Sequence, residues 1–287
     1  MLINPANMMS RLIPVLFVVL FSFQTQAQPA SLAGHAEAAP DYEVALSTIL
    51  SEIVTDDGLV RYDVLGAKHS DGFHRILKAV ETFDLSTLSS HEAKLAFWMN
   101  AYNVHMLKNI LDQPGLENVL ANGMGDQFFK TPRLVGGIAI SLDDLEHAIL
   151  RGEDRDASYT PYQLASLDPR IHVGLNCAAV SCPSLPSKAF TAKNVNDLLD
   201  QAMETFVNSP QHFTKESGAW QFSSLLDWFG PDFDSTGKPA GDFLVGYLAS
   251  HSMAEGLRTA IAGKSSAELK TIEGVTFHYD WTVNRAR

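Results

Sequence analysis

The segment from Glu92 to Leu111 constrains the fold more than any other part of the chain, because it carries apolar residues on two helical faces. Its apolar residues are Leu95, Trp98, Met99, Tyr102, Met106 and Ile110 on one face, and Phe97, Ala101, Val104 and Leu107 on the other. A helix that is apolar on two faces is usually buried among other elements. Ser89 and Glu92 match the Ser-x-x-Glu capping box, which predicts the start of this helix.

Weaker patterns on either side predict the elements that surround this helix. Helices are predicted at residues 41–54, 71–83, 142–151 (capped by Ser141), 194–208, 225–233 and 241–249. Strands are predicted at residues 59–65, 171–177 and 275–283, and as a hairpin within 128–140 that turns at Gly136-Gly137. The expected fold class is therefore α+β: a mostly helical single domain with a small antiparallel sheet around a buried central helix.

The N-terminal residues predict a signal for export. Arg11 is the only charged residue before Ala27, an apolar run covers residues 12–23, and Thr25-Gln26-Ala27 offers small residues for cleavage. We therefore expect a signal peptide at 1–27, a flexible leader at 28–40 that is rich in Ala, Pro, Ser and Gly, and one domain at 41–287. A periplasmic or secreted bacterial protein is the simplest expectation.

The charge of the chain limits its partners. The full chain has a net charge of −12, and loss of the segment with Arg11 leaves 20 basic against 33 acidic residues. An acidic surface repels phosphate backbones, so nucleic acid is not an expected partner. After the signal, no apolar stretch is long enough to span a bilayer, and no stable membrane anchor is expected. A small molecule or a peptide is the expected partner.

Cys177 and Cys182 are the two cysteines of the chain, and three interpretations of the pair stay open. Outside the cytoplasm they could form a structural disulfide. Cys177 could instead be a nucleophile activated by a histidine such as His172. A strand over 171–177 would place His172 and Cys177 on opposite faces, which argues against a direct pair. The third interpretation is a metal site with a histidine, for which the signal is weak because the His-x4-Cys-x4-Cys run lacks the Cys-x2-Cys spacing of structural zinc sites. No cofactor is expected.

Further candidates for chemistry lie on two of the predicted helices. Glu146 lies at the edge of a buried stripe, where a carboxylate can orient an imidazole, and His147 follows it. Asn100 and Asn103 lie one turn apart on the central helix, and a side-chain amide can stabilise an oxyanion. Each of these residues could equally belong to a structural polar network.

Five blocks of the sequence together match the motifs of one known family. The blocks are Phe97-Trp98-Met99-Asn100-Ala101-Tyr102-Asn103, Ser141 to His147 with Ile149 to Arg151, Asp168 to His172 with Asn176-Cys177 and Ser181-Cys182-Pro183, Asp227-Trp228-Phe229 with Asp232-Phe233, and Tyr279-Asp280-Trp281 with Asn284. In this order they resemble the family catalogued as domain of unknown function 547. The resemblance implies a fold and a set of positions rather than a reaction. The implied positions are Asn100, Tyr102, Asn103, Glu146, His147, His172, Cys177, Ser181 and Cys182.

Three hypotheses for function follow. In the first, the protein is a thiol-dependent hydrolase or acyltransferase for amide or thioester bonds. Cys177 is then the nucleophile, His172 or His147 the base, Glu146 the residue that orients the base, and Asn100 or Asn103 the oxyanion donor. In the second, it is a non-catalytic binding or envelope protein with a Cys177–Cys182 disulfide. In the third, it is a metal-dependent enzyme.

Overall fold

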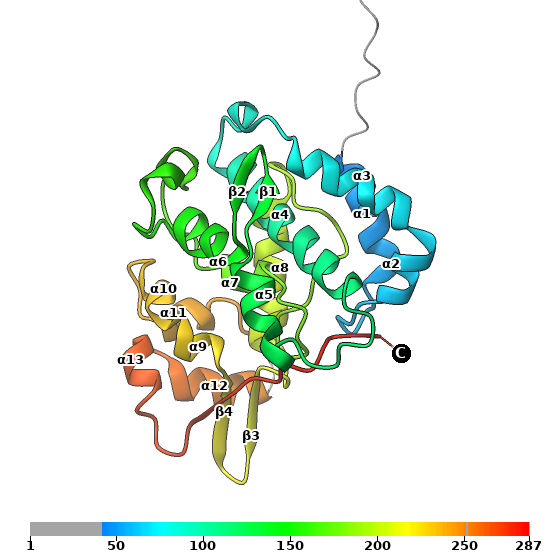
Figure 1. Cartoon of the computed structure of the whole chain (residues 1–287). Coiled ribbons are helices and arrows are strands. Elements are labelled where there is room, and N and C mark those ends of the chain that lie inside the picture. Colours follow the sequence, from blue (N-terminus) through cyan, green and yellow to red (C-terminus); the bar gives the residue numbers. More distant parts are fainter. Residues whose placement is uncertain (1–41, 251, 287) are drawn as a thin grey trace, which may run out of the picture. The chain divides into compact units, whose positions relative to one another are not determined.

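The computed structural model describes residues 42–250 and 252–286, and Figure 1 shows how their elements follow one another. The predicted signal peptide and leader lie outside the described residues. The helical elements of the first half are α1 (Tyr42–Ile53), α2 (Tyr62–Lys68), α3 (Ser70–Glu81), η1 (Leu85–Thr87), α4 (His91–Leu111), η2 (Ala121–Gly123), α5 (Met124–Lys130), α6 (Leu142–Asp144), η3 (Leu145–Leu150) and η4 (Ala157–Tyr162). Those of the second half are α7 (Ile171–Gly174), α8 (Val195–Asn208), α9 (Leu225–Trp228), α10 (Gly230–Asp234), α11 (Ala240–Val245), α12 (Ser252–Ile261) and α13 (Ser266–Leu269).

The long helix α4 forms the centre of the first part of the structure. Every residue from Leu95 to Leu107 is buried, and α4 packs against α2, α3, α8 and η3. This confirms the buried central helix, whose large apolar side chains each contribute about 1.5–3 kcal/mol when buried. The expected cap was wrong by one residue. Ser90, not Ser89, precedes the helix, and its hydroxyl accepts a hydrogen bond from the backbone N–H of Ala93.

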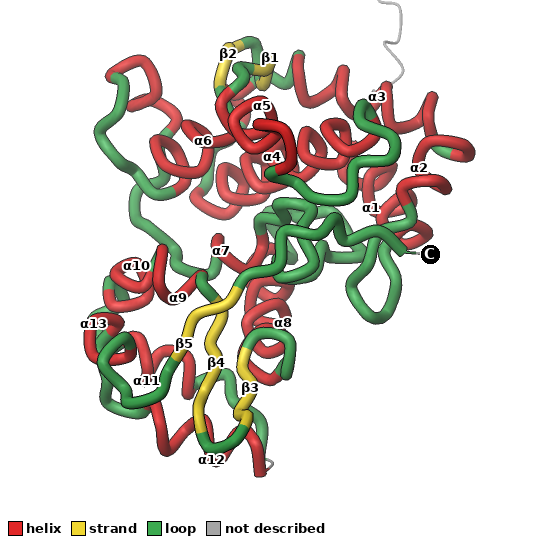
Figure 2. Tube along the Cα trace, turned by 60° about the horizontal axis from the view of Figure 1, so that its bottom comes forward, coloured by secondary structure: helices red, strands yellow, loops and turns green. Residues whose placement is uncertain are grey.

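Two small sheets accompany the helices (Figure 2). The strands are β1 (Arg133–Val135), β2 (Ile138–Ile140), β3 (Phe213–Glu216), β4 (Ala219–Ser223) and β5 (Thr276–His278). β1 and β2 form the expected antiparallel hairpin, and Gly136 and Gly137 both have positive φ at its turn. β3 pairs with β4 in antiparallel orientation, whereas β4 pairs with β5 in parallel, so the second sheet is mixed. The described residues thus confirm an α+β fold.

The apolar core has two clusters. One surrounds α4 and includes residues from α1 to α8. The other lies between the three-stranded sheet and the helices α8 to α13. Tyr279, which follows β5, packs against both clusters. The C-terminal segment therefore runs where the two clusters meet.

Some predicted elements differ from the structure. The strand predicted at 59–65 is wrong, because Tyr62–Lys68 forms α2 and only Val60 pairs with other backbone segments. The strand predicted at 171–177 is also wrong, because Ile171–Gly174 forms one turn of helix. Phe128 belongs to α5 rather than to the hairpin. The helix predicted at 142–151 is present with its Ser141 cap, but from Leu145 onward it is a π-helix.

None of the helices within residues 42–250 and 252–286 has the length and apolar character that a membrane crossing requires.

Candidate active site

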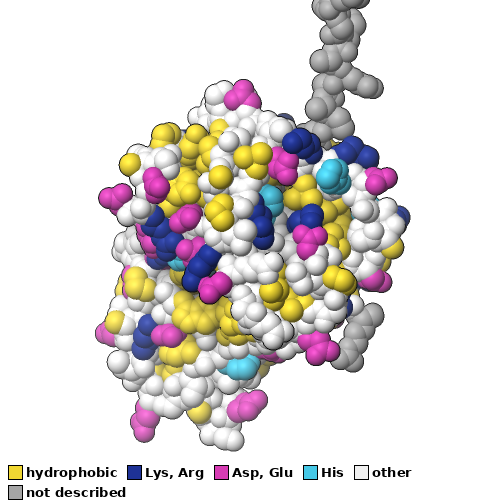
Figure 3. All heavy atoms as spheres, viewed as in Figure 1, with side chains coloured by type: hydrophobic (Ala, Val, Ile, Leu, Met, Phe, Trp, Pro, Cys, Tyr) yellow, Lys and Arg dark blue, Asp and Glu magenta, His cyan; other side chains and the backbone are white. Residues whose placement is uncertain are grey.

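A cavity of about 480 Å³ opens beside both cysteines. Its walls come from α4, α5, the α6–η3 turn, α7, the loop after α7, α9 and the segment after β5. Figure 3 shows hydrophobic side chains gathered between the positions of α5 and α9. Of the six residues given candidate catalytic roles from the sequence, three line this cavity: Glu146, His172 and Cys177. The volume lies within the range of about 300–1,000 Å³ that is typical of small-molecule sites.

The loop that carries Cys177 is held by side-chain amides. Asn176 accepts a hydrogen bond from the Ala178 N–H at 3.0 Å and donates to the Pro183 carbonyl at 2.9 Å. Ala178 has a φ of +62°, a left-handed conformation that few residues other than glycine adopt. Such strain persists only where the surrounding contacts hold it, and it is frequent at functional sites. The loop thus presents Cys177 on a fixed, strained turn.

The C-terminal segment fixes the other side of the same loop. The Val180 N–H donates to the Thr282 carbonyl at 2.7 Å, and the Asp280 N–H donates to the Ser181 hydroxyl at 2.8 Å. These contacts bring the Tyr279 hydroxyl to 2.9 Å from the Cys177 sulfur, although 102 residues separate the two in sequence. The backbone contacts of the C-terminal segment therefore hold the Tyr279 hydroxyl beside the Cys177 thiol.

The two thiols differ in their electrostatic surroundings. Burial disfavours the Cys177 thiolate, but hydrogen bonds from the Cys182 thiol, the Tyr279 hydroxyl and the Ala179 backbone N–H lower the pKa of Cys177 below its usual value. Burial and the neighbouring Cys177 raise the pKa of Cys182. The Cys177 N–H donates to the Cys182 sulfur at 2.9 Å, and both cysteines are free thiols. Cys177 is the thiol that ionises first.

His172 lies in the cavity wall with a fully buried side chain. Its Nε2 lies 2.7 Å from Asp232 Oδ2, and its ring stacks on Phe229 at 4.0 Å between centroids. An ionised carboxylate only accepts hydrogen bonds, so Nε2 carries the proton. Nδ1 has no hydrogen-bond partner and lies 3.7 Å from Glu146 Oε1. In the neutral ring, Nδ1 is therefore available as a base.

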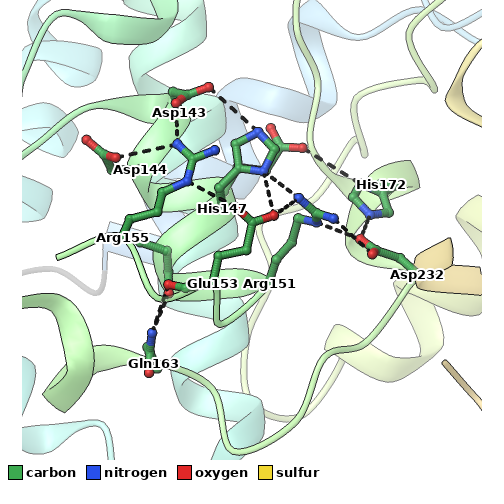
Figure 4. A network of polar contacts seen from close by, with 11 residues as sticks. Asp143, Asp144, His147, Arg151, Glu153, Arg155, Gln163, His172 and Asp232 are labelled. Carbon is green, nitrogen blue, oxygen red and sulfur yellow. Dashed lines mark hydrogen bonds and ion pairs between the residues drawn. The ribbon is translucent and has the colours of Figure 1, made fainter. Parts of the chain in front are cut away.

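The carboxylates beside His172 favour its protonated form. Burial opposes the imidazolium, but Asp232 and Glu146 outweigh it and raise the pKa of His172. The guanidinium of Arg151 binds Asp232 through Nε at 2.6 Å and a second nitrogen at 2.9 Å. His172 and Arg151 together hold the pKa of Asp232 well below its usual range, despite burial. Asp232 therefore stays ionised and orients the imidazole (Figure 4).

Glu146 lies in the π-helical turn η3 and lines the cavity. Single π-helical turns occur often at functional sites. The side chain of Glu146 is 15% exposed, so solvent or a ligand in the cavity can reach it. Glu146 lies beside the imidazole of His172, and its role in orienting that ring stays a prediction.

His147, the second histidine considered as a base, lies elsewhere. It takes part in a polar network in which its Nδ1 lies 2.6 Å from an Arg151 nitrogen and its Nε2 lies 3.6 Å from Asp143 (Figure 4). It is not among the residues that line the cavity. Through Arg151, the network braces Asp232 rather than contacting Cys177.

Asn100 and Asn103 are also outside the cavity wall. The amide of Asn100 donates to the Phe190 carbonyl at 2.7 Å and accepts from the Phe190 N–H at 3.0 Å. That of Asn103 donates to the Gly174 carbonyl at 3.0 Å and accepts from the Asn176 N–H at 2.8 Å. Both therefore tie α4 to neighbouring backbone segments, and Asn103 positions the loop that leads to Cys177.

The central part of the chain matches a known protein family. Residues 85–207 match the family described as a protein of unknown function, DUF547. The chain carries a DUF547 family domain. The DUF547 match covers Glu146, His172, Cys177 and Cys182, whereas Asp232 and Tyr279 follow it in sequence. Comparisons with curated proteins and with solved structures found no match for the chain.

The part of the site beyond the DUF547 match received no role in the sequence analysis. Asp232, Tyr279 and Trp228 all belong to the blocks by which the sequence resembles this family, yet no chemical role followed from their local patterns. The repeated Asp-Trp and Tyr-Asp-Trp combinations were the sequence signal that could have pointed to these residues. Tyr102 was also on the list of family positions, and it lines the cavity from α4.

The helical turn α7 removes the geometric objection to a shared site. In a strand, His172 and Cys177 would face opposite sides, but in the folded chain both line one cavity. No hydrogen bond between the Cys177 sulfur and an imidazole is present among the described residues. Within residues 42–250 and 252–286, no cluster of three or more His, Cys, Asp or Glu is arranged to hold a metal ion.

Proposed function

We propose that the protein is a thiol-dependent hydrolase or acyltransferase that acts on amide or thioester bonds, with Cys177 as the nucleophile. The observation that carries the proposal is the position of the Cys177 thiol, whose pKa is lowered, in the wall of the same cavity as His172, which Asp232 contacts from behind the wall. A lowered pKa, access to a cavity and a nearby base are what nucleophilic thiols require.

The proposed reaction assigns one role to each side chain. The Cys177 proton passes to His172 Nδ1 through a water molecule or a substrate group, and the thiolate attacks the carbonyl carbon. The carbon–sulfur bond forms as the carbonyl electron pair moves to oxygen. When that pair returns, the amine or thiol leaves and takes the proton from His172. Water, or an acceptor nucleophile, then cleaves the acyl-Cys177 bond by the same steps.

Hydroxyl groups replace the asparagines as proposed donors to the oxyanion. Tyr102 and Tyr279 both line the cavity. Burial raises the pKa of each, so both hydroxyls keep their protons at neutral pH. A protonated hydroxyl in a site with little water can stabilise the negative oxygen of a tetrahedral intermediate. Glu146 would stabilise the imidazolium that forms on His172.

Trapping of an acyl-enzyme tests this proposal. The full chain is mixed with a series of N-acetylcysteamine thioesters, and its mass is measured within seconds. We expect an acyl adduct on the peptide that carries Cys177, and none in Cys177→Ala. Cys182→Ala should keep the adduct but lose about tenfold in kcat/KM, because a hydrogen bond to a charged group contributes about 1.5 kcal/mol. Thioester turnover by Cys177→Ala at the wild-type rate would contradict the proposal.

We also propose that the protein acts in the periplasm or outside a bacterial cell. The charge and apolar pattern of residues 1–27 support this location. N-terminal sequencing of protein made in a Gram-negative bacterium should then begin at Gln28. A product in the soluble cytoplasmic fraction that still begins at Met1 would contradict export.

A non-catalytic exported protein with a structural disulfide is the alternative. The observation that favours it is the closeness of the two cysteines, since the Cys177 N–H contacts the Cys182 sulfur directly. Counting thiols on non-reduced, purified protein separates the two functions. Two free thiols, with Cys177 alkylated before Cys182 at neutral pH, support the nucleophile. A bridge that resists mild reductant supports the structural disulfide.

A further inference from the structure

The cavity beside Cys177 has an aromatic wall with an exposed edge. Trp228, Tyr279 and Trp281 contact one another, with ring centroids 4.8 Å apart for Trp228–Tyr279 and 4.6 Å for Tyr279–Trp281. Trp228 is 44% exposed, and Leu120, from another part of the wall, is 43% exposed. Large apolar side chains that stay exposed around a concavity commonly mark a ligand site.

The charged groups of the wall are already paired with one another or with neighbours. Asp126 lies 2.6 Å from Lys130, and both are in the wall. Asp143 contacts Arg155, and Glu146 faces His172. Each carboxylate of the wall therefore already has a partner, and none is left to bind a cationic ligand. Lys130 is likewise engaged by Asp126, so the charged side chains of the wall leave no unpaired partner for a charged ligand of either sign.

Because the charges are paired and the aromatic edge is exposed, we propose that the cavity binds the acyl part of the substrate, and that this acyl part is apolar and uncharged. It would lie against Trp228 and Trp281, with its carbonyl carbon at the Cys177 sulfur. This inference rests on the proposed function, because it names the substrate class of the same nucleophile. Burial of the methylene groups of such a chain against the aromatic wall would supply its binding free energy.

Binding to an inactive variant tests the inference without any chemistry. Three amides of equal chain length serve as probes: hexanamide, 6-aminohexanamide with a terminal cation, and adipamate with a terminal anion. Their binding to Cys177→Ala is measured by isothermal titration calorimetry. We expect hexanamide to bind at least tenfold more tightly than either charged amide. Equal or tighter binding of a charged amide, or no binding of hexanamide, would overturn the inference.

A matched pair of surface variants locates the binding. In the Cys177→Ala background, Leu120→Glu should weaken hexanamide binding at least tenfold, because it places a charge at the apolar wall. Leu134→Glu is the control, since Leu134 is also 43% exposed but lies on β1 and does not line the cavity. An equal effect of the two substitutions, or none from Leu120→Glu, would overturn the inference.

The two proposals can fail separately. Tight hexanamide binding with no acyl adduct on Cys177 from any thioester would contradict the hydrolase and leave an apolar binding site. An acyl adduct that forms equally fast from hexanoyl, 6-aminohexanoyl and adipoyl thioesters would support the nucleophile and overturn the choice of acyl group.

Discussion

At the scale of single residues, the site depends on side chains whose partners are far away in sequence. Asp232 is 60 residues from His172, and Tyr279 is 102 residues from Cys177. Each contact changes the chemistry of the residue it reaches, since Asp232 raises the pKa of His172 and Tyr279 lowers that of Cys177. Reactive groups are thus tuned by neighbours that no local pattern reveals.

Substitution of Asp232 should change both the rate and its dependence on pH. In Asp232→Asn the charge that favours the imidazolium is lost, so the pKa of His172 falls. In the proposed reaction the neutral imidazole is the base, so thioester kcat/KM should rise as pH passes the pKa of His172. We therefore expect this rising limb to move to lower pH and the maximum to fall about hundredfold. Stopped-flow pH profiles measure both.

Asp227→Asn is the matched control for that experiment. Asp227 lies in the neighbouring helix α9, pairs with Lys270 at 2.7 Å and does not line the cavity. Its substitution should leave the pH profile unchanged. A rising limb at the same pH in Asp232→Asn and the wild type would show that Asp232 does not act through His172.

At the scale of elements, long periodic segments were predictable and short ones were not. The two-faced pattern of α4 and the amphipathic pattern of α8 appear in the structure with nearly their expected bounds. α7 was predicted as a strand because Ile171-His172-Val173 resembles one locally. Its single turn is held instead by tertiary contacts such as the Asn103 bond to the Gly174 carbonyl. Tertiary packing commonly overrides propensity in segments this short.

The hairpin of β3 and β4 was missed although a turn signal was present. Ser217 and Gly218 both have positive φ between the two strands. A two-residue turn with this geometry is typical of hairpins. β3 carries Lys215 and Glu216 at its end, so its apolar alternation is too short to be noticed. The partner of β4 on its other side, β5, comes from near the end of the chain.

Close packing between α11 and the end of α12 gives an expectation at the same scale. A Cβ added at Gly241 would lie 1.8 Å from the Ile261 carbonyl oxygen, which is backbone and cannot turn aside. Gly241→Ala should therefore lower the free energy of unfolding by about 3 kcal/mol, measured by urea denaturation.

Gly72→Ala is the control for that substitution. Gly72 lies in α3, and the nearest atom to its added Cβ is 3.6 Å away. Alanine is favoured over glycine in a helix, so this change should raise the free energy of unfolding by up to about 1 kcal/mol. A neutral effect of Gly241→Ala would mean that α11 and α12 can separate without loss of stability.

At the scale of the whole molecule, the site lies where the two core clusters meet. The DUF547 match ends at Val207, within α8, while Asp232 and Tyr279 come from the part that follows. The sequence therefore drew attention to Cys177 and its loop, but it gave no role to Asp232, which contacts His172, or to Tyr279, which contacts Cys177. These residues come together only because the two core clusters pack against each other. Predicted helices and strands, taken one by one, carry no information about that packing.

Both clusters also contain a buried histidine that makes the fold sensitive to acid. Burial, together with the charge of Arg133, lowers the pKa of His105 in α4 to about 4, and burial lowers that of His212 before β3 to about 4. An unfolded histidine has a pKa of about 6.5. The unfolded chain therefore binds more protons between these values, and stability falls as pH decreases from about 6.5 to 4. His172, with its raised pKa, acts in the opposite sense, so a single-site comparison is needed.

His212→Leu should remove one of these acid-sensitive contributions. The His212 ring packs on Phe206 with 4.7 Å between centroids, and its Nδ1 has no hydrogen-bond partner, so leucine removes the titrating ring without leaving a buried polar atom unpaired. The loss of unfolding free energy between pH 7.5 and pH 4.5 should be smaller in His212→Leu by up to about 3 kcal/mol. Urea denaturation at both pH values gives this difference. His74→Leu, on the exposed face of α3, is the control, because solvent reaches that ring in the folded and the unfolded chain. If His74→Leu protected against acid as well as His212→Leu does, burial of His212 could not be the cause of the acid sensitivity.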